Sequence, residues 1–336
     1  MKKPGIIVKN IAIIILIAVV LPSAALSAKK DSSNAYYLRG NKYLLRNKVD
    51  KAIDNYLKAI QINPKRAKYF YKLAKAYERK QSIKDAILNY EKTITIDPTY
   101  YWAYAGLGNI CLAMGDSTQA TQYYEMCINN CPKEYTKHYF RGKIFDVTHQ
   151  IDDAIAAYKE ALRCRQDYFE ALSALAHDYV LKNDFENAAE YYLRAKKLRC
   201  YDEMTLINLG IAYTKLAKYD AALDVLNVAL KIDPFNRDTR FYLGRAYYGN
   251  GDLDQAINQT RRALNAVPDD AEVHFTLGLY YDKKGWHDMA VAEYQEALYL
   301  NPEYLFNKLK KLDRENETAV LRDGQESPQG DNESEL

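Results

Sequence analysis

The chain of 336 residues has few of the residues that build metal, redox and catalytic sites. Its five cysteines and five histidines form no CxxC, no HExxH and no Cys/His cluster. Neither a GxGxxG nor a Walker phosphate-binding sequence occurs. The sequence therefore predicts no catalytic residue, no metal ligand and no cofactor, and we expect that the protein is not an enzyme.

Disulfides are also not expected to organise this chain. An odd number of cysteines cannot pair completely within one molecule, and Cys127 and Cys131 stand one helical turn apart. We expect buried or loop thiols, and an oxidised pair is the alternative in an oxidising compartment.

Glycine and proline are scarce, with 14 and 9 copies, and long alternating apolar runs are absent from the sequence. Both features predict helices rather than strands. Tyrosine is abundant, with 31 copies against 9 Phe and 2 Trp. This abundance indicates either a recurring structural position or a binding surface.

No strong excess of charge of one sign is present, since 47 basic residues face 44 acidic ones. The balance is too even for nucleic-acid binding. The exception is the C-terminal stretch 323–336, which has five acidic residues and no basic one. We expect this stretch to be a disordered acidic tail.

The first 28 residues differ from the rest of the chain. Three lysines precede an apolar run from Ile11 to Leu21, and small residues follow Pro22. This layout predicts a cleaved secretory signal over 1–28, followed by a short linker over 29–32. The run is short for a membrane span of roughly 20 residues, but an uncleaved anchor over 11–28 is the alternative. Either outcome predicts a periplasmic or secreted protein.

A repeat of 34 residues organises the remainder of the chain. Pro64, Pro98 and Pro132 are spaced by 34, and Pro234 and Pro268 keep the same register. Position 8 of each repeat is always Gly or Ala, and position 20 is always Ala. Small residues at these positions let two antiparallel helices approach closely. The eight repeats are 33–66, 67–100, 101–134, 135–168, 169–202, 203–236, 237–270 and 271–304.

Each repeat is predicted to form a helix, a short turn and a second helix. Aromatic residues recur at positions 11 and 24, and Leu recurs four residues before position 11, which gives one apolar helical face. Pairs such as Gly115-Asp116 mark the turn within a repeat. Pairs such as Asp97-Pro98 end the second helix, because proline cannot continue it.

This spacing resembles the tetratricopeptide repeat, and the resemblance covers residues 33–304. It implies an all-α, right-handed superhelical solenoid. Departures are local: Gln166 and Cys200 replace the loop proline, and Leu226 and Thr260 replace the second-helix aromatic residue. The apolar face of the last repeat needs a capping element that shields it from solvent. We predict a capping helix over 305–322, with Leu305, Leu309 and Leu312 on its inner face.

In proteins of this family, six positions of the first helix line an inner groove that holds partners. The resemblance therefore implies a partner-binding groove formed by Lys68, Tyr71, Lys72, Lys75, Trp102, Asn109, Tyr139, Phe140, Lys143, His177, Asn208, Phe241, Tyr242, Arg245 and Tyr248. Each lysine could instead belong to a solvated face, and each tyrosine could simply pack. As a group, the aromatic and basic residues favour a binding surface. The carboxylate clamp of chaperone-binding relatives is not reproduced, because Tyr37, Trp102 and Gly106 stand where basic residues are expected.

The function predicted from the sequence is that of an exported scaffold whose groove holds a segment of another protein. The segment is expected to be acidic and to carry an apolar anchor. A glycan or cell-wall binding module that uses the same aromatic residues is the alternative. No nucleic acid is expected as a partner, and the membrane is expected to be contacted only through an uncleaved N-terminal segment.

Overall fold

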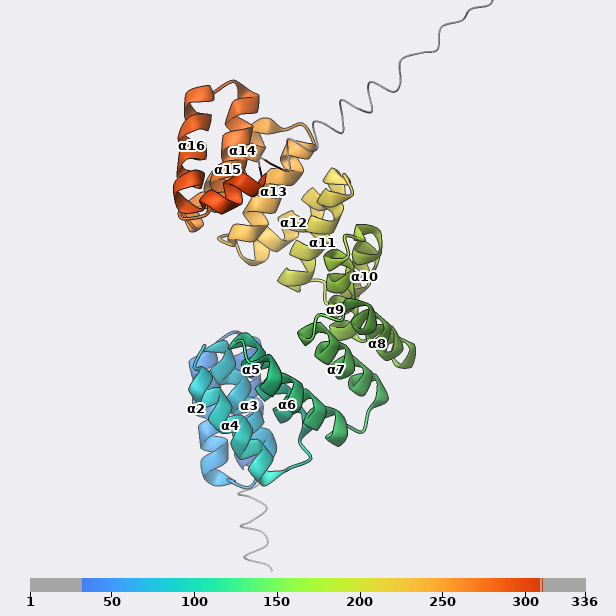
Figure 1. Ribbon diagram of the computed structural model, residues 1–336. Helices are drawn as coiled ribbons and strands as arrows, with labels where there is room; N and C mark the ends of the chain where they lie inside the picture. Colours follow the sequence, from blue (N-terminus) through green and yellow to red (C-terminus); the bar gives the residue numbers. More distant parts are fainter. Residues whose placement is uncertain (1–31, 309, 311–336) are drawn as a thin grey trace, which may run out of the picture. The chain divides into compact units, whose positions relative to one another are not determined.

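The computed structural model describes residues 32–308 and 310, and the secondary structure within this part of the chain is helical throughout (Figure 1). The predicted all-α helical-hairpin solenoid is confirmed. The predicted leader 1–28, linker residues 29–31, the cap beyond residue 310 and the acidic tail 323–336 lie outside the described residues.

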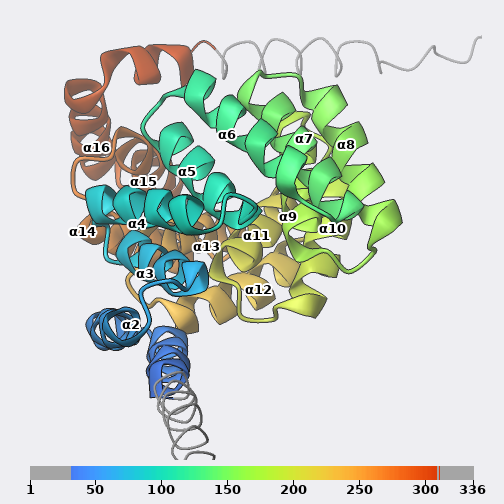
Figure 2. The same cartoon turned by 90° about the horizontal axis from the view of Figure 1, so that it is seen from below.

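The chain divides into two compact units, and the boundary falls between Ala171 and Leu172. In unit 1, successive helices pack against each other in chain order, and Figures 1 and 2 show α2 to α8 side by side. The helices of unit 1 are a helix over 32–45, α2 (Val49–Ile62), α3 (Ala67–Arg79), α4 (Ile83–Ile96), α5 (Tyr101–Ala113), α6 (Ser117–Asn130), α7 (Glu134–Val147) and α8 (Ile151–Cys164).

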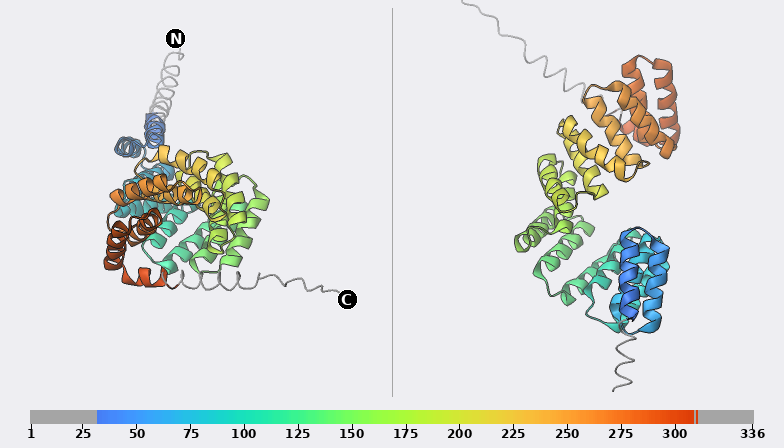
Figure 3. Two further views of the ribbon diagram at one scale, coloured as in Figure 1. Left: turned by 90° about the horizontal axis from the view of Figure 1, so that it is seen from above. Right: turned by 180° about the vertical axis from the view of Figure 1, so that it is seen from behind.

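Unit 2 repeats this arrangement, and its yellow to red helices follow one another in both views of Figure 3. Helix α9 (Phe169–Leu181) begins in unit 1 and continues into unit 2. The other helices of unit 2 are α10 (Phe185–Leu198), α11 (Glu203–Lys215), α12 (Tyr219–Ile232), α13 (Arg237–Gly249), α14 (Leu253–Ala266), α15 (Ala271–Lys284), α16 (His287–Leu300) and a helix over 302–308.

The turn within every repeat uses one residue with positive φ, always at position 15. Glycine occupies this position in three repeats, for example Gly115 with a φ of 82°. The other five repeats place a residue with a Cβ there, and Ala217 has a φ of 55°. The left-handed conformation costs such a residue roughly 1–2 kcal/mol. The turn geometry therefore belongs to the repeat and does not depend on glycine.

The predicted crossing points of the helices lie in the core. All eight alanines at position 20 are buried, with an exposed fraction of at most 1%. Position 8 must be small because the side chain at position 24 lies against it. A Cβ on Gly108 would lie 2.6 Å from the ring of Tyr124, and a Cβ on Gly40 would lie 2.6 Å from the ring of Tyr56.

The last described helix begins at residue 302, earlier than the predicted start at 305. Pro302 fits the first turn of a helix, where no intrahelical N–H bond is needed. The Asn301 side chain accepts a hydrogen bond from the backbone N–H of Tyr304 (2.9 Å). Leu305 is buried against Phe275 and Ala297, as expected of a cap. Leu309 and Leu312 lie outside the described residues.

Candidate functional site

A tyrosine hydroxyl from the second helix reaches polar residues of the first helix in several repeats. The Tyr124 hydroxyl donates to Asn109 Oδ1 (2.7 Å), and the Tyr90 hydroxyl donates to Glu78 Oε1 (2.8 Å). Glu78 also pairs with Lys75. The same type of bond joins Tyr56 to Asn41 and Tyr158 to Asp146. We call these position-24 residues the stapling tyrosines.

The sequence carries a signal for these bonds. In the repeats joined in this way, an amide or a carboxylate stands at position 9 or 12. Repeats 6 and 7 have Leu226 and Thr260 at position 24, and neither has an amide or a carboxylate at positions 9 and 12. In repeats 1 to 4 the tyrosine and the acceptor occur together and bond, whereas repeat 5 has Tyr192 without an acceptor at position 9 or 12.

The stapling tyrosines change the role expected for two predicted site residues. Asn109 is exposed, but its side-chain oxygen already accepts the hydrogen bond from Tyr124. Tyr192 makes a side-chain hydrogen bond with Asn208. The amide oxygen of Asn109 is therefore occupied by the fold, and Asn109 can offer a ligand only its NH₂ group as a donor.

The basic residues of unit 1 are half-buried among tyrosines. The Lys68 ammonium lies 4.7 Å from the centre of the Tyr37 ring, and the Lys72 ammonium lies 5.8 Å from that of Tyr71. Burial, followed by the nearby charge of Lys75, lowers the pKa of Lys72. Burial also raises the pKa of Tyr71. The structure therefore places Lys68, Tyr71 and Lys72 on α3, beside Tyr37 of the helix over 32–45.

Trp102 on α5 and Tyr139 on α7 belong to one aromatic cluster with Phe140. The ring centres of Trp102 and Phe140 are 6.1 Å apart, and those of Tyr139 and Phe140 are 5.0 Å apart. Phe140 is only 2% exposed, so the prediction that it lines an open groove is wrong. Trp102, Tyr139 and Lys143 are half-buried and keep part of their surface in solvent.

In unit 2 the predicted residues divide into core and surface. Phe241 has no exposed surface, because it packs in a cluster with Ala263 and Val273. Its assignment to the groove is wrong for the same reason as that of Phe140. Tyr242 is half-buried beside Phe241, and His177 is exposed on α9.

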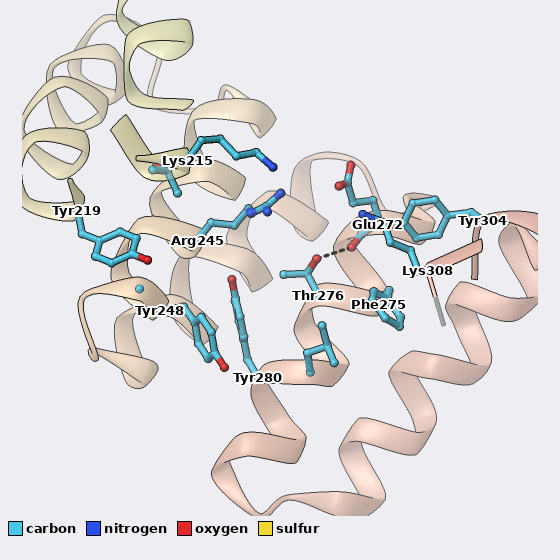
Figure 4. Close-up of a pocket in the computed structure, with 13 residues that line it drawn as sticks. Lys215, Tyr219, Arg245, Tyr248, Glu272, Phe275, Thr276, Tyr280, Tyr304 and Lys308 are labelled. Carbon is cyan, nitrogen blue, oxygen red and sulfur yellow. Dashed lines mark hydrogen bonds between the residues drawn. The ribbon is translucent and has the colours of Figure 1, made fainter. Parts of the chain in front are cut away.

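Two predicted residues, Arg245 and Tyr248, line a cavity of about 450 Å³ in unit 2. Figure 4 shows Arg245 pointing into this cavity between Lys215 and Thr276. We call it the Arg245 pocket. Its polar and aromatic lining consists of Thr214, Lys215, Tyr219, Arg245, Tyr248, Glu272, Phe275, Thr276, Tyr280, Tyr304 and Lys308.

Stacked tyrosines form one side of the Arg245 pocket. The rings of Tyr248 on α13 and Tyr280 on α15 are nearly parallel, with centres 4.7 Å apart and planes inclined by 19°. Tyr280 is buried, whereas Tyr248 is 44% exposed. The pocket therefore offers a supported aromatic surface that solvent can reach.

The charges around the pocket are predominantly positive. Lys215, Arg245 and Lys308 line it together with one acid, Glu272. Burial raises the pKa of Tyr304, and the negative charge of Glu272 raises it further while Arg245 opposes the shift. With three basic residues and one acid in its lining, the pocket favours an anionic ligand.

Tyr219 enters the pocket from the start of α12 because Gly249 has no side chain. A Cβ at Gly249 would collide with the Tyr219 ring. This contact could not be predicted, since nothing in the spacing of the repeats indicates that the two residues meet. Lys215, Glu272 and Thr276 could have been found, because they occupy the same groove positions in repeats 6 and 8 that we used elsewhere.

The part of the chain that the structure describes holds neither a metal-binding cluster nor a membrane-spanning helix. Residues 32–308 and 310 contain no group of three or more His, Cys, Asp or Glu side chains arranged to bind a metal ion. No helix in the same residues is both long enough and apolar enough to cross a membrane. The five cysteines have free thiols, and burial raises the pKa of Cys127.

Models of one known family match several parts of the chain. These models, described as TPR repeat or tetratricopeptide repeat, match residues 40–81, 67–100, 89–122, 213–277 and 271–304. Human tetratricopeptide repeat protein 6 is 28% identical over 191 residues, which represent 55% of this chain and 36% of that protein. The chain thus spans about a third of the length of this relative.

Two further comparisons agree with this assignment. The human N-alpha-acetyltransferase 16, NatA auxiliary subunit, is 27% identical over 170 residues, or 50% of this chain and 19% of that protein. Among solved structures, the APC/C hetero-tetramer Cut9-Hcn1 has a TM-score of 0.67 at 20% identity. The alignment covers 83% of this chain and 55% of the solved chain, and at this identity it supports the fold alone.

Proposed function

This chain belongs to the tetratricopeptide-repeat family, whose fold implies a scaffold for protein–protein interaction, and we propose that it holds a segment of a partner protein. We also propose that it acts outside the cytoplasm. The segment lies against the first helices of the repeats. Export is proposed from the basic start and the short apolar run of residues 1–28. The scaffold role does not require chemistry by the protein itself.

The Arg245 pocket is the observation that carries this proposal. It combines the two features of binding hot spots, a supported aromatic ring at Tyr248 and an arginine at Arg245. Its volume of about 450 Å³ lies within the range of roughly 300–1,000 Å³ that is usual for ligand sites. Unit 1 adds Lys68, Lys72 and Trp102 as further half-buried contact residues on first helices.

A glycan is the competing ligand, since sugars also stack on tyrosine rings. A neutral sugar site is expected to place acids and amides beside the exposed ring. The Arg245 pocket instead has three basic residues and a single acid, Glu272. This composition favours an anionic protein segment over a neutral glycan.

Site-specific photo-crosslinking in the native envelope tests the proposal. A photoreactive phenylalanine derivative would replace Tyr248, which is in the pocket. The matched control would carry it in place of Tyr299, which is 83% exposed on α16 and does not line the pocket. We expect a crosslinked protein, identified by mass spectrometry, from position 248 and not from position 299.

Two results would contradict the proposal. Crosslinking from position 299 alone would place the partner on another surface. Crosslinking of position 248 to a polysaccharide, with no protein adduct, would replace the proposed partner by a glycan.

A further inference from the structure

We propose that the Arg245 pocket recognises a short internal motif of the partner, an Asp or Glu side chain next to an aromatic residue. This inference rests on the proposed function and specifies the ligand of the same surface. The carboxylate binds Arg245, and the aromatic ring packs against Tyr248.

Arg245 is built to bind a carboxylate from outside the fold. Its guanidinium lies 5.8 Å from the centre of the Phe241 ring and 6.0 Å from that of the Tyr242 ring, within the range of cation–π contacts. Among residues 32–308 and 310, no carboxylate pairs with Arg245, whereas Arg237 pairs with Asp270. A planar guanidinium without a carboxylate partner keeps its N–H groups available for a bidentate bond.

Two other ammonium groups reinforce the preference for a negative charge. Lys215 lines the pocket on the side of α11, and Lys308 lines it from the helix over 302–308. The Lys308 ammonium lies 5.3 Å from the centre of the Tyr304 ring. A carboxylate at Arg245 is therefore flanked by positive charge from two separate elements of unit 2.

The aromatic part of the motif has a prepared surface beside Arg245. The ring of Tyr248 is supported from behind by Tyr280 and is partly open to solvent. Tyr219 forms a neighbouring wall (Figure 4). An aromatic side chain inserted here gains apolar burial and stacking, which exceeds the gain of an aliphatic side chain of similar size.

Glu272 explains why the motif contains one acid and not a run of acids. Its carboxylate faces the same pocket, next to Tyr304 and Lys308 in Figure 4. A second acid in the ligand would meet this like charge and lose part of the attraction to the basic residues. The volume of about 450 Å³ suits a short motif.

Peptide selection on the full chain tests this inference. The probe is a library of random heptapeptides displayed through their C-termini, so that none carries a free terminal carboxylate. The library is selected separately on the protein, on Arg245→Gln and on Arg261→Gln, where Arg261 is an exposed arginine of α14 that lies outside the pocket. We expect acid-aromatic pairs to be enriched by the protein and by Arg261→Gln, and not by Arg245→Gln.

The affinity of a selected peptide for the protein is then measured by fluorescence anisotropy. Replacing its acid by the corresponding amide is expected to weaken binding roughly tenfold or more, because a charge-assisted bond is lost. Tyr248→Ala is expected to weaken binding by a similar factor, while Tyr299→Ala leaves it unchanged. Added salt should reduce the affinity only in part, since the aromatic contact is not screened.

The inference and the proposed function fail in different ways. Enriched peptides without an acid, unchanged enrichment on Arg245→Gln, or binding that needs a free terminal carboxylate would overturn the motif. If position 248 nevertheless crosslinks to a protein, the scaffold proposal stands and only the ligand is wrong. If neither experiment gives a protein ligand, both are overturned.

Discussion

The stapling tyrosines give a stability prediction whose size depends on the acceptor. Tyr90 and Tyr124 have rings with no exposed surface, and their hydroxyls donate at 2.8 and 2.7 Å. The acceptor of Tyr90 is the Glu78 carboxylate, whose side chain is 19% exposed. The acceptor of Tyr124 is Asn109, which is exposed and can bind water instead.

We therefore expect Tyr90→Phe to cost more than Tyr124→Phe. Removing the donor to Glu78 loses a charge-assisted bond in a partly buried place, worth about 1.5–3 kcal/mol, although Lys75 still pairs with this acid. Removing the donor to Asn109 loses a neutral bond that water replaces, at a cost of about 0.5–1.5 kcal/mol. Both changes preserve the shape of the ring, so packing contributes little to the difference.

Urea denaturation followed by circular dichroism at 222 nm measures both free energies of unfolding. Because repeat arrays can unfold in several steps, single and double variants are compared in two double-mutant cycles, one of Tyr90→Phe with Glu78→Gln and one of Tyr124→Phe with Asn109→Ala. We expect a coupling energy between Tyr90 and Glu78 that is larger than the one between Tyr124 and Asn109. Equal costs for the two phenylalanine variants, or no coupling between Tyr90 and Glu78, would refute the reasoning.

Four further predictions concern the rest of the chain. Ala188→Leu should overpack a position with no exposed surface and lower the free energy of unfolding by roughly 1–3 kcal/mol, measured by the same denaturation. Ala217→Gly should relieve the strain of a positive φ, increase the free energy of unfolding by up to about 1 kcal/mol and raise the melting temperature. A melting temperature below that of the unchanged protein would contradict the strain argument. Burial raises the pKa of Tyr90 above the ordinary tyrosine value of about 10. The stability that the neutral Tyr90 side chain contributes is therefore complete below about pH 10 and is lost as the pH rises further. Phenolate absorbance and helix loss should then occur together in alkali, and early ionisation in a fully helical protein would contradict this. N-terminal sequencing of the exported protein should start after Ala25 or Ala28, whereas an intact Met1 on membrane-bound material would indicate an anchor.

The fold was predictable from the sequence because one spacing imposes it in every repeat. The alanine at position 20 and the small residue at position 8 mark where helices meet, and the structure buries them as expected. The positive φ at Ala217 was not predictable, since alanine is not a residue that favours this conformation. There the hydrogen bonds of the repeat override the local preference of the residue.

The candidate site was predictable only in part. Helix position placed Arg245 and Tyr248 on the correct face, and both line the pocket. The same rule failed for Phe140 and Phe241, because helix position sets the direction of a side chain but not how much its neighbours cover it. Tyr219 was missed for a related reason, since its place depends on the space that Gly249 leaves.

Repeats 6 and 7, which supply Lys215, Arg245 and Tyr248 to the pocket, have no tyrosine at position 24. In repeat 7 the hydroxyl of Thr260 is buried, and no partner for it occurs among the described residues. These hairpins therefore have fewer bonds that resist local opening, and their backbone amides should exchange hydrogen sooner than those of the stapled repeats. A ligand that contacts both α13 and α15 restricts the opening of repeat 7, so binding and the local folding of this hairpin are thermodynamically linked. A hairpin that lacks a side-chain bond of its own is then stabilised by its partner.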